Sequence, residues 1–376
     1  MPSTTPDPDS VSRRDFLRLV AAGSAALAGG LTSRTLAEVS GPRNGRKLGV
    51  ALVGLGNYST NQLRPALLQT KLCRLTGMVS GRPEVAARWA RELGLPASSI
   101  YNYDNFDRIA DNPDIDIVYV VTPPALHADT VVRAAKAGKH VICEKPLAAT
   151  VADCDTMIAA CRAARVKFSV GYRLHFDPYH LEMMRLAHTQ ELGVFKGMAG
   201  EHSFRLRKRI WRINKKLAGG GPMMDMGIYV VHGAIMAQDG ATPVAVTAYE
   251  EPKEDPELFN EVEESMRFTM EFANGAQMDG SSSFDRGQDR LWLHGTKGWM
   301  DFPAGAFSYR YILCGTSRGP LDFSPPVNQQ ALQMDDFADC ILTGRETPVP
   351  GEMGRRDIRI LTAIYEAART GQRVLV

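Results

Sequence analysis

The sequence lacks an excess of charge of either sign. Lys and Arg together number 44 and Asp and Glu number 42, so the formal net charge is +2. Neutralising the phosphates of a nucleic acid requires clustered Lys and Arg, and we therefore expect no nucleic-acid partner. The composition of 44% hydrophobic and 23% charged residues is typical of a globular protein and argues against a disordered or fibrous chain.

Cysteine is scarce and carries no metal-binding pattern. The six cysteines form no CxxC pair and no metal-ligand spacing; they are Cys73, Cys143, Cys154, Cys161, Cys314 and Cys340. We predict that they are buried, unpaired thiols, because free Cys is among the most buried residue types. His175 and His180 also lack a third ligand at a suitable spacing. The sequence therefore predicts no metal site.

The N-terminal region has no apolar run long enough to span a membrane. Leu19–Ser33 is uncharged and rich in Ala and Gly, but it is shorter and less apolar than the roughly 20 residues that a spanning helix needs. It follows Arg13-Arg14 and precedes the small-residue cleavage point Leu36-Ala37, as in a signal peptide. The paired arginines resemble a twin-arginine export signal. We predict a signal peptide over 1–37 and a mature periplasmic protein without a membrane anchor.

Such signals carry proteins that are already folded, often with a cofactor inside.

The polar segment 38–46 follows as an N-terminal arm without periodicity. Over 47–170, short apolar runs alternate with helical segments. This alternation is typical of βαβ units and predicts a doubly wound Rossmann domain whose parallel sheet is covered on both faces.

The pattern changes after the first domain. Over 171–328, successive strands with period-2 stretches, such as Met266–Phe272, predict an α+β domain with a large, mostly antiparallel sheet covered on one face. Ser308–Leu313 is expected to be one of these strands. Two helices complete the chain over 329–376. The fold class is therefore α/β for the first domain and α+β for the second.

A glycine-rich turn follows the first apolar run. Gly54 allows a sharp turn, and Gly56 leaves no Cβ where a pyrophosphate would approach the backbone. Asn57 and Tyr58 then open a helix, and Ser59 replaces the usual third glycine. A strand, a G-x-G turn and a helix in this order predict a dinucleotide site.

The end of the second apolar run predicts which dinucleotide binds. Ser80, Gly81 and Arg82 stand where a carboxylate would bind the 2′-hydroxyl of NAD. A hydroxyl and a guanidinium suit a 2′-phosphate instead, so the sequence favours NADP(H). The alternative is that Arg82 is a solvated charge at the start of a helix.

The segment Glu144-Lys145-Pro146 comes directly after another strand, at the edge where parallel sheets bind ligands. From this point the chain closely resembles the family of glucose–fructose oxidoreductases, inositol dehydrogenases and their relatives. The resemblance is carried by Gly54-Leu55-Gly56-Asn57, Thr122-Pro123-Pro124 with His127, Ala137–Val141 and Glu144-Lys145-Pro146. Within the family, the sugar–sugar oxidoreductases that are exported, including aldose–aldose enzymes, are the most similar branch.

The resemblance implies site residues and partners. Lys145 maps to the family's catalytic lysine, and Asp225 to its conserved aspartate. The usual histidine four residues later is Tyr229, as in the glucose–fructose branch. Contacts with the cofactor are expected from Thr122, Pro123, His127, Glu144 and Lys145, in addition to the glycine turn. The antiparallel sheet often pairs subunits in this family, so we expect a homo-oligomer, either a dimer or a tetramer.

The residue types support these roles independently. Asp225 and Tyr229, at positions i and i+4, share one helix face. Tyr229 can serve as a base near neutral pH only if a cation lies close by, and Lys145 and an oxidised nicotinamide ring are the expected cations. The alternatives are a helix-start charge for Asp225 and a core aromatic for Tyr229. Sugar contacts are expected from Tyr172, Arg173, His175, Trp211, Arg212, Asp225 and Tyr229. The alternative for Tyr172, Arg173, His175, Trp211 and His127 is a purely structural role.

Together these features predict an oxidoreductase that acts on two small sugars. It would oxidise an aldose at C1 to the lactone and reduce a second sugar to an alditol on one tightly bound NADP(H). The alternatives are a redox-assisted glycosidase with bound NAD, a simple NADP-dependent sugar dehydrogenase, and a non-enzymatic sugar sensor. The Tyr229 position disfavours the glycosidase, and the complete set of Lys145, Asp225 and Tyr229 disfavours the sensor.

Overall fold

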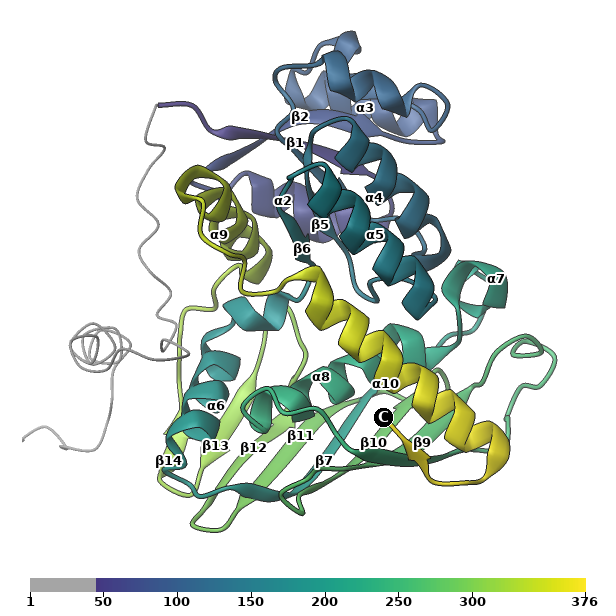
Figure 1. Cartoon of the computed structure of the whole chain (residues 1–376), viewed down its shortest axis with the longest axis vertical. Helices are drawn as coiled ribbons and strands as arrows, with labels where there is room; N and C mark the ends of the chain where they lie inside the picture. The colour runs from purple at the N-terminus through teal and green to yellow at the C-terminus, as the bar shows by residue number, and fades with distance from the viewer. Residues whose placement is uncertain (1–44) are drawn as a thin grey trace, which may run out of the picture.

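The structure is a computed structural model, and it describes residues 45–376. The predicted signal peptide (1–37) and most of the predicted arm (38–46) lie outside the described residues. The described chain forms two domains, each built on one β-sheet, and the last two long helices run beside both (Figure 1).

The first domain contains a six-stranded sheet in the order β3-β2-β1-β4-β5-β6. All of its strand pairs are parallel. The strands are β1 (Leu48–Val53), β2 (Cys73–Val79), β3 (Ile100–Tyr101), β4 (Ile117–Val120), β5 (His140–Cys143) and β6 (Phe168–Val170). Every residue of β1 is buried, as expected for a central strand covered on both faces. The prediction of a doubly wound Rossmann domain is confirmed.

Helices connect these strands and cover the sheet (Figure 1). They are α2 (Arg64–Leu67), α3 (Pro83–Leu93), α4 (His127–Lys136) and α5 (Val151–Ala163), with the short helices η2 (Ser59–Leu63), η3 (Ala97–Ser99), η4 (Phe106–Asp111) and η5 (Pro124–Leu126). The side chain of Thr150 caps α5 by accepting a hydrogen bond from the backbone N–H of Asp153. Crossover helices of this kind bring the carboxyl ends of the parallel strands to one edge of the sheet.

The second domain contains a nine-stranded sheet in the order β14-β13-β12-β11-β7-β10-β9-β8-β15. Only the β7–β10 pair is parallel among the described strands of this sheet. The strands are β7 (Phe195–Ser203), β8 (Ala245–Glu250), β9 (Ser265–Glu271), β10 (Gln277–Ser283), β11 (Gln288–Gly295), β12 (Trp299–Ala304), β13 (Leu313–Thr316), β14 (Gly319–Leu321) and β15 (Val374–Leu375). The predicted large, mostly antiparallel sheet is confirmed.

One predicted strand is wrong. Ser308–Leu313 is not a strand; β13 begins at Leu313. The hydroxyl of Ser308 instead accepts hydrogen bonds from the backbone N–H groups of Arg310 and Tyr311, which fold the segment into a turn. Polar and apolar residues do alternate there, but the backbone N–H groups of Arg310 and Tyr311 bond to the Ser308 hydroxyl and not to a neighbouring strand.

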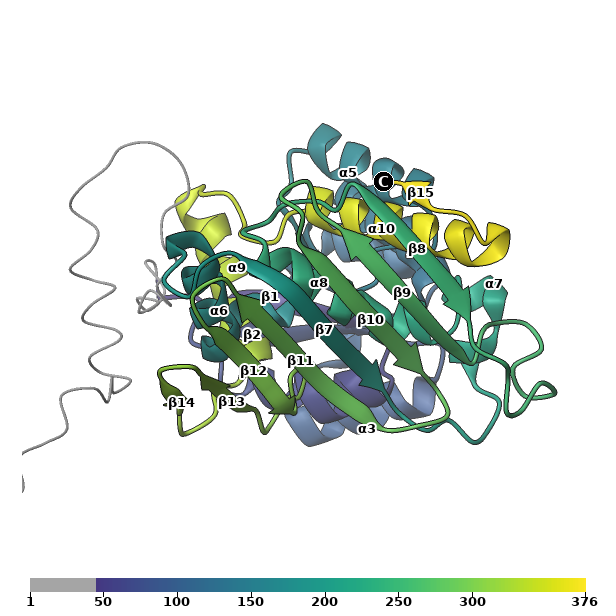
Figure 2. The ribbon, with the colours of Figure 1, turned by 90° about the horizontal axis from the view of Figure 1, so that it is seen from below.

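Helices cover one face of the large sheet and leave the other face uncovered, as Figure 2 shows. The covering elements include α6 (Pro178–Thr189) and α8 (Ile228–Ala237). The remaining short elements of this domain are η6 (Arg173–Phe176), η7 (Trp211–Ile213), α7 (Lys215–Ala218) and η8 (Met223–Gly227). Burial alternates along β9, where Met266, Phe268 and Met270 are buried while the residues between them are partly exposed. This confirms the predicted single covered face.

The last two long helices join the domains. α9 (Gln329–Thr343) contacts α2, β2 and η2 of the first domain, and α10 (Gly351–Thr370) packs on β8 and α5. The Asp335 carboxylate on α9 accepts hydrogen bonds from the backbone N–H groups of Lys71 and Leu72, both at 2.8 Å. The helix therefore closes back onto the dinucleotide domain.

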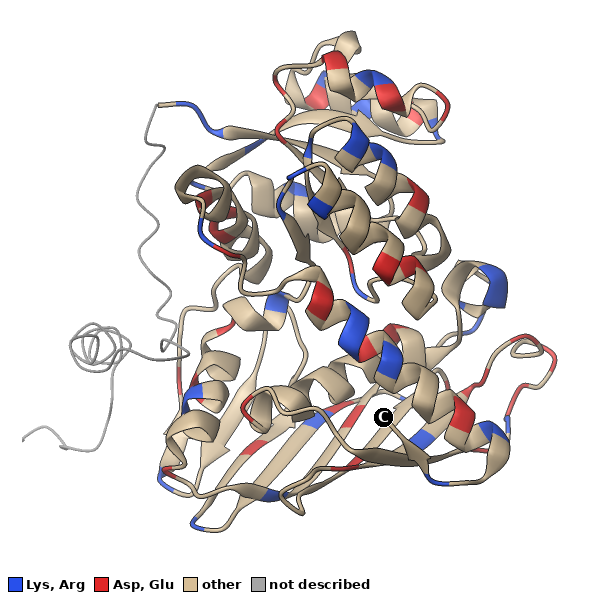
Figure 3. Cartoon of the chain, in the orientation of Figure 1, with Lys and Arg blue, Asp and Glu red and all other residues tan. Residues whose placement is uncertain are grey.

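The six cysteines are buried and unpaired, as predicted. Between residues 45 and 376, no helix has the length and apolarity to cross a membrane. The same residues contain no group of three or more His, Cys, Asp or Glu side chains placed to hold a metal ion. Positive and negative residues are interspersed over both domains (Figure 3).

Candidate active site

The glycine turn lies at the carboxyl end of β1, where the parallel strands β1, β4 and β5 end side by side. Gly54 has a φ of +94°, and a Cβ there would lie 2.8 Å from the carbonyl oxygen of Val121. A Cβ on Gly56 would meet nothing within 4 Å, so open space adjoins the backbone there. The hydroxyl of Ser59 donates a hydrogen bond to the Gly54 carbonyl at 2.5 Å, which fixes the turn.

Two observations show that these residues fit a dinucleotide. Open space beside Gly56 is what the close approach of a pyrophosphate requires. The Thr122 hydroxyl, just after β4, is buried and has no hydrogen-bond partner among the described residues. A buried polar atom without a partner is costly unless a ligand or water satisfies it. Asn57 and Tyr58 lie at the start of the following helix, with Asn57 accepting a hydrogen bond from Asn61.

Ser80, Gly81 and Arg82 lie next to this turn. The Arg82 guanidinium donates a hydrogen bond to the carbonyl of Leu55 at 2.7 Å, and the Ser80 hydroxyl accepts one from the Arg82 N–H at 3.0 Å. The structure thus brings together the two segments that were assigned to the dinucleotide. Tyr103, which the sequence reasoning missed, lies against Gly81, where a Cβ would be 3.1 Å from its ring.

Lys145, Asp225 and Arg212 form one ionic cluster. Lys145 Nζ donates to the Asp225 backbone carbonyl at 2.7 Å and lies 3.3 Å from Asp225 Oδ1. Arg212 Nε donates to Asp225 Oδ2 at 2.7 Å. Burial raises the pKa of Asp225, but the positive charges of Lys145 and Arg212 outweigh it and lower that pKa to about 2. Asp225 is therefore an anion that holds both cations.

Lys145 contacts both Asp225 and Tyr229. The two residues therefore lie on the same helix face, as their i, i+4 spacing predicted. Lys145 Nζ is 4.7 Å from the centre of the Tyr229 ring, over its face. Asp225 belongs to the π-helical turn η8, and Tyr229 to α8, which continues it. Burial raises the pKa of the Tyr229 phenol, and Arg173 opposes this shift.

Arg173 lies on η6 just after the end of β6, as the sequence indicated, and it is only 1% exposed. Its predicted sugar contact stays a prediction. Arg173 Nε donates a hydrogen bond to Tyr229 Oη at 3.3 Å, and its other donors contact Gln329, Phe307 and Ser308. The cation that touches the phenol oxygen is therefore Arg173, whereas Lys145 lies over the ring.

Tyr172 and His175 belong to a second buried network. The Tyr172 hydroxyl donates to Asp357 at 2.7 Å, and His232 Nδ1 lies 2.6 Å from the same carboxylate oxygen. His175 Nε2 lies 2.8 Å from His232 Nε2. The Tyr172 hydroxyl therefore points away from the Lys145 cluster, although its side chain lines a void of about 10 Å³ together with Lys145 and Tyr229. The sugar contacts of Tyr172 and His175 stay predictions.

Trp211 and Arg212 form the outer side of the cluster. The Arg212 guanidinium carbon lies 4.6 Å from the centre of the Trp211 ring while its Nε bonds Asp225. Trp211 is partly exposed. The Trp211 ring thus lies against the same arginine that contacts Asp225, and its predicted stacking on a sugar stays a prediction.

His127 and Glu144 are structural neighbours of Lys145. The ring nitrogens of His127 lie 3.0 Å from the Leu147 carbonyl oxygen and 2.8 Å from that of Thr122. His127 thereby links the two loops, and its contact with the nicotinamide stays a prediction. Buried Glu144 accepts hydrogen bonds from the Tyr119 hydroxyl and the Lys145 N–H. Pro123, partly exposed, precedes η5 at the end of β4.

Sequence reasoning missed Tyr309 and three glutamines. Gln329, Gln330 and Gln333 lie on α9 and contact Arg173, Tyr58 and Tyr119, respectively. The ring centres of Tyr309 and Tyr58 are 6.0 Å apart. No local pattern marks these residues, because each contact joins segments far apart in the sequence.

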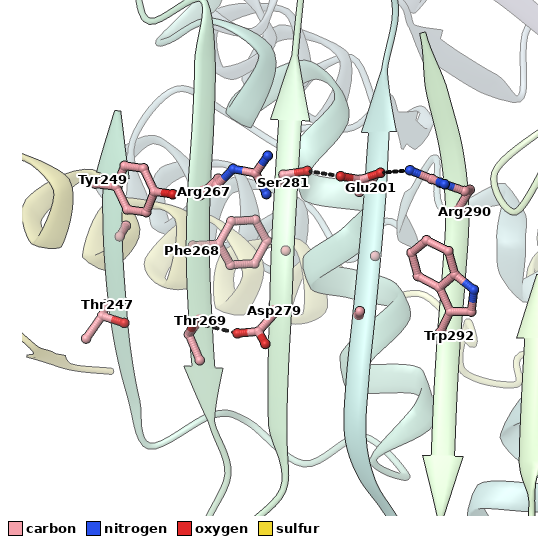
Figure 4. A pocket seen from close by; sticks show the side chains of 14 residues that line it. Glu201, Thr247, Tyr249, Arg267, Phe268, Thr269, Asp279, Ser281, Arg290 and Trp292 are labelled. Carbon is pink, nitrogen blue, oxygen red and sulfur yellow. Dashed lines mark hydrogen bonds and ion pairs between the residues drawn. The ribbon is translucent and has the colours of Figure 1, made fainter. Parts of the chain in front are cut away.

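A larger hollow lies elsewhere, on the uncovered face of the nine-stranded sheet. Its volume is about 500 Å³, and Figure 4 shows its side chains arranged in rows across five strands. Glu201 accepts hydrogen bonds from Ser281 and Arg290 at its floor. None of the residues predicted for the site lines this hollow. We assign the active site to the Lys145 cluster, because that cluster combines buried charges with the dinucleotide turn.

The fold and this site define a nicotinamide-dinucleotide-dependent oxidoreductase. Residues 48–172 match the model described as "Oxidoreductase family, NAD-binding Rossmann fold", and residues 180–301 match the GFO/IDH/MocA C-terminal domain. The chain belongs to the GFO/IDH/MocA family, which confirms the resemblance found in the sequence.

Individual relatives cover most of the chain. It is 42% identical to the aldose-aldose oxidoreductase from Caulobacter crescentus, solved with glycerol, with a TM-score of 0.85 over 88% of this chain and 100% of that one. It is 28% identical to D-xylose 1-dehydrogenase [NADP(+)] of Haloarcula marismortui over 92% of this chain and 97% of that protein. A D-xylose 1-dehydrogenase (NADP(+)) of Haloferax volcanii is 30% identical, with 79% and 90% covered.

Proposed function

We propose that the protein is a periplasmic sugar–sugar oxidoreductase. It oxidises an aldose at C1 to the lactone and reduces a second sugar to an alditol on one tightly bound NADP(H). The observation that carries this proposal is the contact of Lys145 with both Asp225 and Tyr229, in a chain 42% identical to an aldose-aldose oxidoreductase.

The residues supply proton transfer and orientation. A dinucleotide held by the glycine turn would supply the hydride chemistry, as an acceptor for the first sugar and a donor for the second. Tyr229 Oη takes the proton of the C1 hydroxyl and later gives a proton to the second sugar. Lys145 has three N–H donors; Asp225 engages two of them, which leaves one to polarise a sugar oxygen. Trp211 offers an aromatic face on which a sugar can stack.

Ser80 and Arg82 support NADP(H) as the cofactor. The Arg82 guanidinium adjoins the glycine turn through Leu55, and a guanidinium suits a phosphate. Two relatives that cover most of the chain are named as NADP(+)-dependent. We expect the cofactor to be tightly held, because an exported enzyme has no cytoplasmic NADPH supply, and internal turnover between two sugars removes the need for one.

The periplasmic location rests on the paired arginines and the segment behind them. A fusion of residues 1–40 to a reporter protein tests it: export should require Arg13 and Arg14, and export that survives their replacement by Lys would contradict a twin-arginine route.

We also propose that subunits pair through the uncovered face of the nine-stranded sheet. Tyr249 on this face is 57% exposed, and Trp292 lines the hollow of Figure 4. Exposed aromatic side chains around a broad hollow are typical of protein interfaces. A homo-oligomer, either a dimer or a tetramer, would cover them.

Products from sugar pairs test the function. The purified protein is incubated with single aldoses and with pairs of aldoses, and lactone, aldonate and alditol are identified. Equal amounts of oxidised and reduced sugar, without added cofactor, are expected. Purified protein without any bound nicotinamide would overturn tight retention, and oxidation that needs added NADP would indicate a simple dehydrogenase. Release of leaving groups from aryl glycosides would indicate a glycosidase.

A further inference from the structure

The Tyr229 hydroxyl has a cationic partner that the proposed mechanism does not use. Arg173, on η6, points Nε at Tyr229 Oη from 3.3 Å, and its guanidinium carbon lies 4.9 Å from the centre of the Tyr229 ring. Lys145 makes no contact with this oxygen in the observed geometry, because two of its N–H groups are directed at Asp225 and its Nζ lies over the face of the Tyr229 ring.

We propose that Arg173 is the positioning residue that sets the proton affinity of Tyr229 Oη and the direction of its O–H bond. This inference rests on the proposed function, in which Tyr229 transfers the proton. A phenolate accepts a hydrogen bond from a guanidinium more strongly than a neutral phenol does, so the contact favours the base form of Tyr229. Arg173 has no acceptor atom, and the phenol proton must therefore point away from it.

The surroundings hold the guanidinium rigidly in this orientation. Arg173 Nη1 donates to Gln329 Oε1 at 2.5 Å and to the Ser308 carbonyl at 3.3 Å, and Nη2 donates to the Phe307 carbonyl. Its carbon lies 4.2 Å from the centre of the Tyr309 ring. A buried arginine with its donors occupied costs little reorganisation when charge develops on its neighbour.

Several titratable groups besides Arg173 face Tyr229. They are Lys145 and Glu144 after β5, Asp225 on η8, His202 on β7, Tyr309 in the loop before β13, and Tyr58 at the start of the helix that follows the glycine turn. Glu144 and Asp225 are negative and oppose ionisation of Tyr229. The His202 ring lies 5.2 Å from the Tyr229 ring, and burial lowers the pKa of His202 to about 3, so His202 carries no charge at neutral pH. Arg173 is the group that contacts the oxygen itself.

The test measures the rate of the first half-reaction against pH. Protein loaded with NADP⁺ is mixed with a donor aldose, and the absorbance of the reduced nicotinamide is followed. The rate should rise with pH as Tyr229 ionises. In Arg173→Met this rise should move upward by about 1–2 pH units, the effect of losing one charge-assisted hydrogen bond. Arg173→Lys, which keeps the cation, should move it less.

A second readout does not depend on activity. The ultraviolet titration of Tyr229 is taken as the difference between the loaded protein and Tyr229→Phe, and it should move upward in Arg173→Met with the rate profile. If the Arg173 variants do not fold, Gln329→Leu replaces them, because it removes one anchor and keeps the guanidinium. A smaller upward shift is expected there, and an unmoved titration would overturn the proposal.

Arg373→Met is the matched control. It removes one positive charge from the same domain by breaking an exposed pair with Glu271, and its pH profile should equal that of the unmodified protein. A slower Arg173→Met enzyme with an unmoved profile would show that Arg173 is only structural, while the proposed function stands. Full activity of Tyr229→Phe would instead remove Tyr229 from the mechanism and overturn both.

Discussion

Replacing Tyr229 by Phe removes one oxygen atom and leaves the aromatic packing in place. The ring would still lie between Lys145 and Arg173, whose charged groups are 4.7 Å and 4.9 Å from its centre. It would also keep its edge contact with His202 at 5.2 Å. What is lost is the proton-transfer group and the acceptor of one Arg173 N–H.

These losses have separate magnitudes. A positioned acid or base contributes about 10²–10⁴-fold to the rate, which corresponds to roughly 3–5 kcal/mol of barrier. The lost hydrogen bond is long at 3.3 Å, and Arg173 keeps its bonds to Gln329 and to two carbonyls. We therefore expect a stability loss of only about 1 kcal/mol. Tyr229 is not among the residues predicted to hold the dinucleotide, so we expect a bound nicotinamide to remain.

The assay separates the two half-reactions in single-turnover experiments. Reduction of the cofactor by the donor sugar and its reoxidation by the acceptor sugar are each followed spectroscopically. Both rates should fall together, because one oxygen removes a proton from the first sugar and returns one to the second. Slowing of only one half-reaction would mean that each sugar has its own acid–base group. A rate within threefold of the unmodified enzyme would refute the reasoning and make Tyr229 a packed core residue.

Three further changes test other parts of the structure. Arg82→Ala should weaken NADP by about 10–100-fold, the value of one charge-assisted contact, while NAD binding changes little; equal losses in a titration of both cofactors would exclude a role in reading the phosphate. Burial raises the pKa of Asp357, but His232 and Arg356 lower it to about 2, below the unfolded value of about 3.9. The ionised Asp357 carboxylate therefore stabilises the fold above about pH 4, and this stabilisation is lost as the pH falls toward 2. Asp357→Asn should lower the free energy of unfolding by about 3 kcal/mol or more near neutral pH. In denaturant titrations, the stability of this variant should also fall less steeply between pH 4 and pH 2. Tyr249→Glu should reduce the oligomer mass in sedimentation experiments without loss of folding, and an unchanged mass would argue against pairing through that face.

Local sequence patterns predicted the parts of the site that form locally. The run Leu48–Val53 followed by Gly54 and Gly56 encodes a strand and its turn, because burial and backbone freedom are properties of neighbouring residues. Lys145 directly follows a strand, and adjacency in the chain places it at the edge of the sheet. The four-residue spacing of Asp225 and Tyr229 specifies a shared helix face in the same way, and the structure places both against Lys145.

The parts that depend on distant contacts could not be predicted. Arg173 follows a strand end, which suggested an exposed ligand contact, but the chain from Phe307 to Tyr309 covers it. The same segment looked like a strand because polar and apolar residues alternate. Its carbonyl groups instead accept hydrogen bonds from Arg173, and no pattern within the segment reports a donor more than a hundred residues away.

Helix α9 contacts both the candidate active site and the dinucleotide domain. Its first two turns present three amides in succession to the site: Gln329 binds Arg173, Gln330 contacts the Tyr58 hydroxyl at 3.4 Å, and Gln333 donates to the Tyr119 hydroxyl at 2.8 Å. Tyr119 in turn donates to Glu144, the neighbour of Lys145. One helix thus contacts Arg173, which supports the proposed proton-transfer group, and the helix that follows the dinucleotide turn, and it reaches Glu144 beside Lys145 through Tyr119 on β4. A displacement of α9 would disturb all three contacts at once, so we expect the proposed cofactor retention and the proposed proton transfer to depend on the same element.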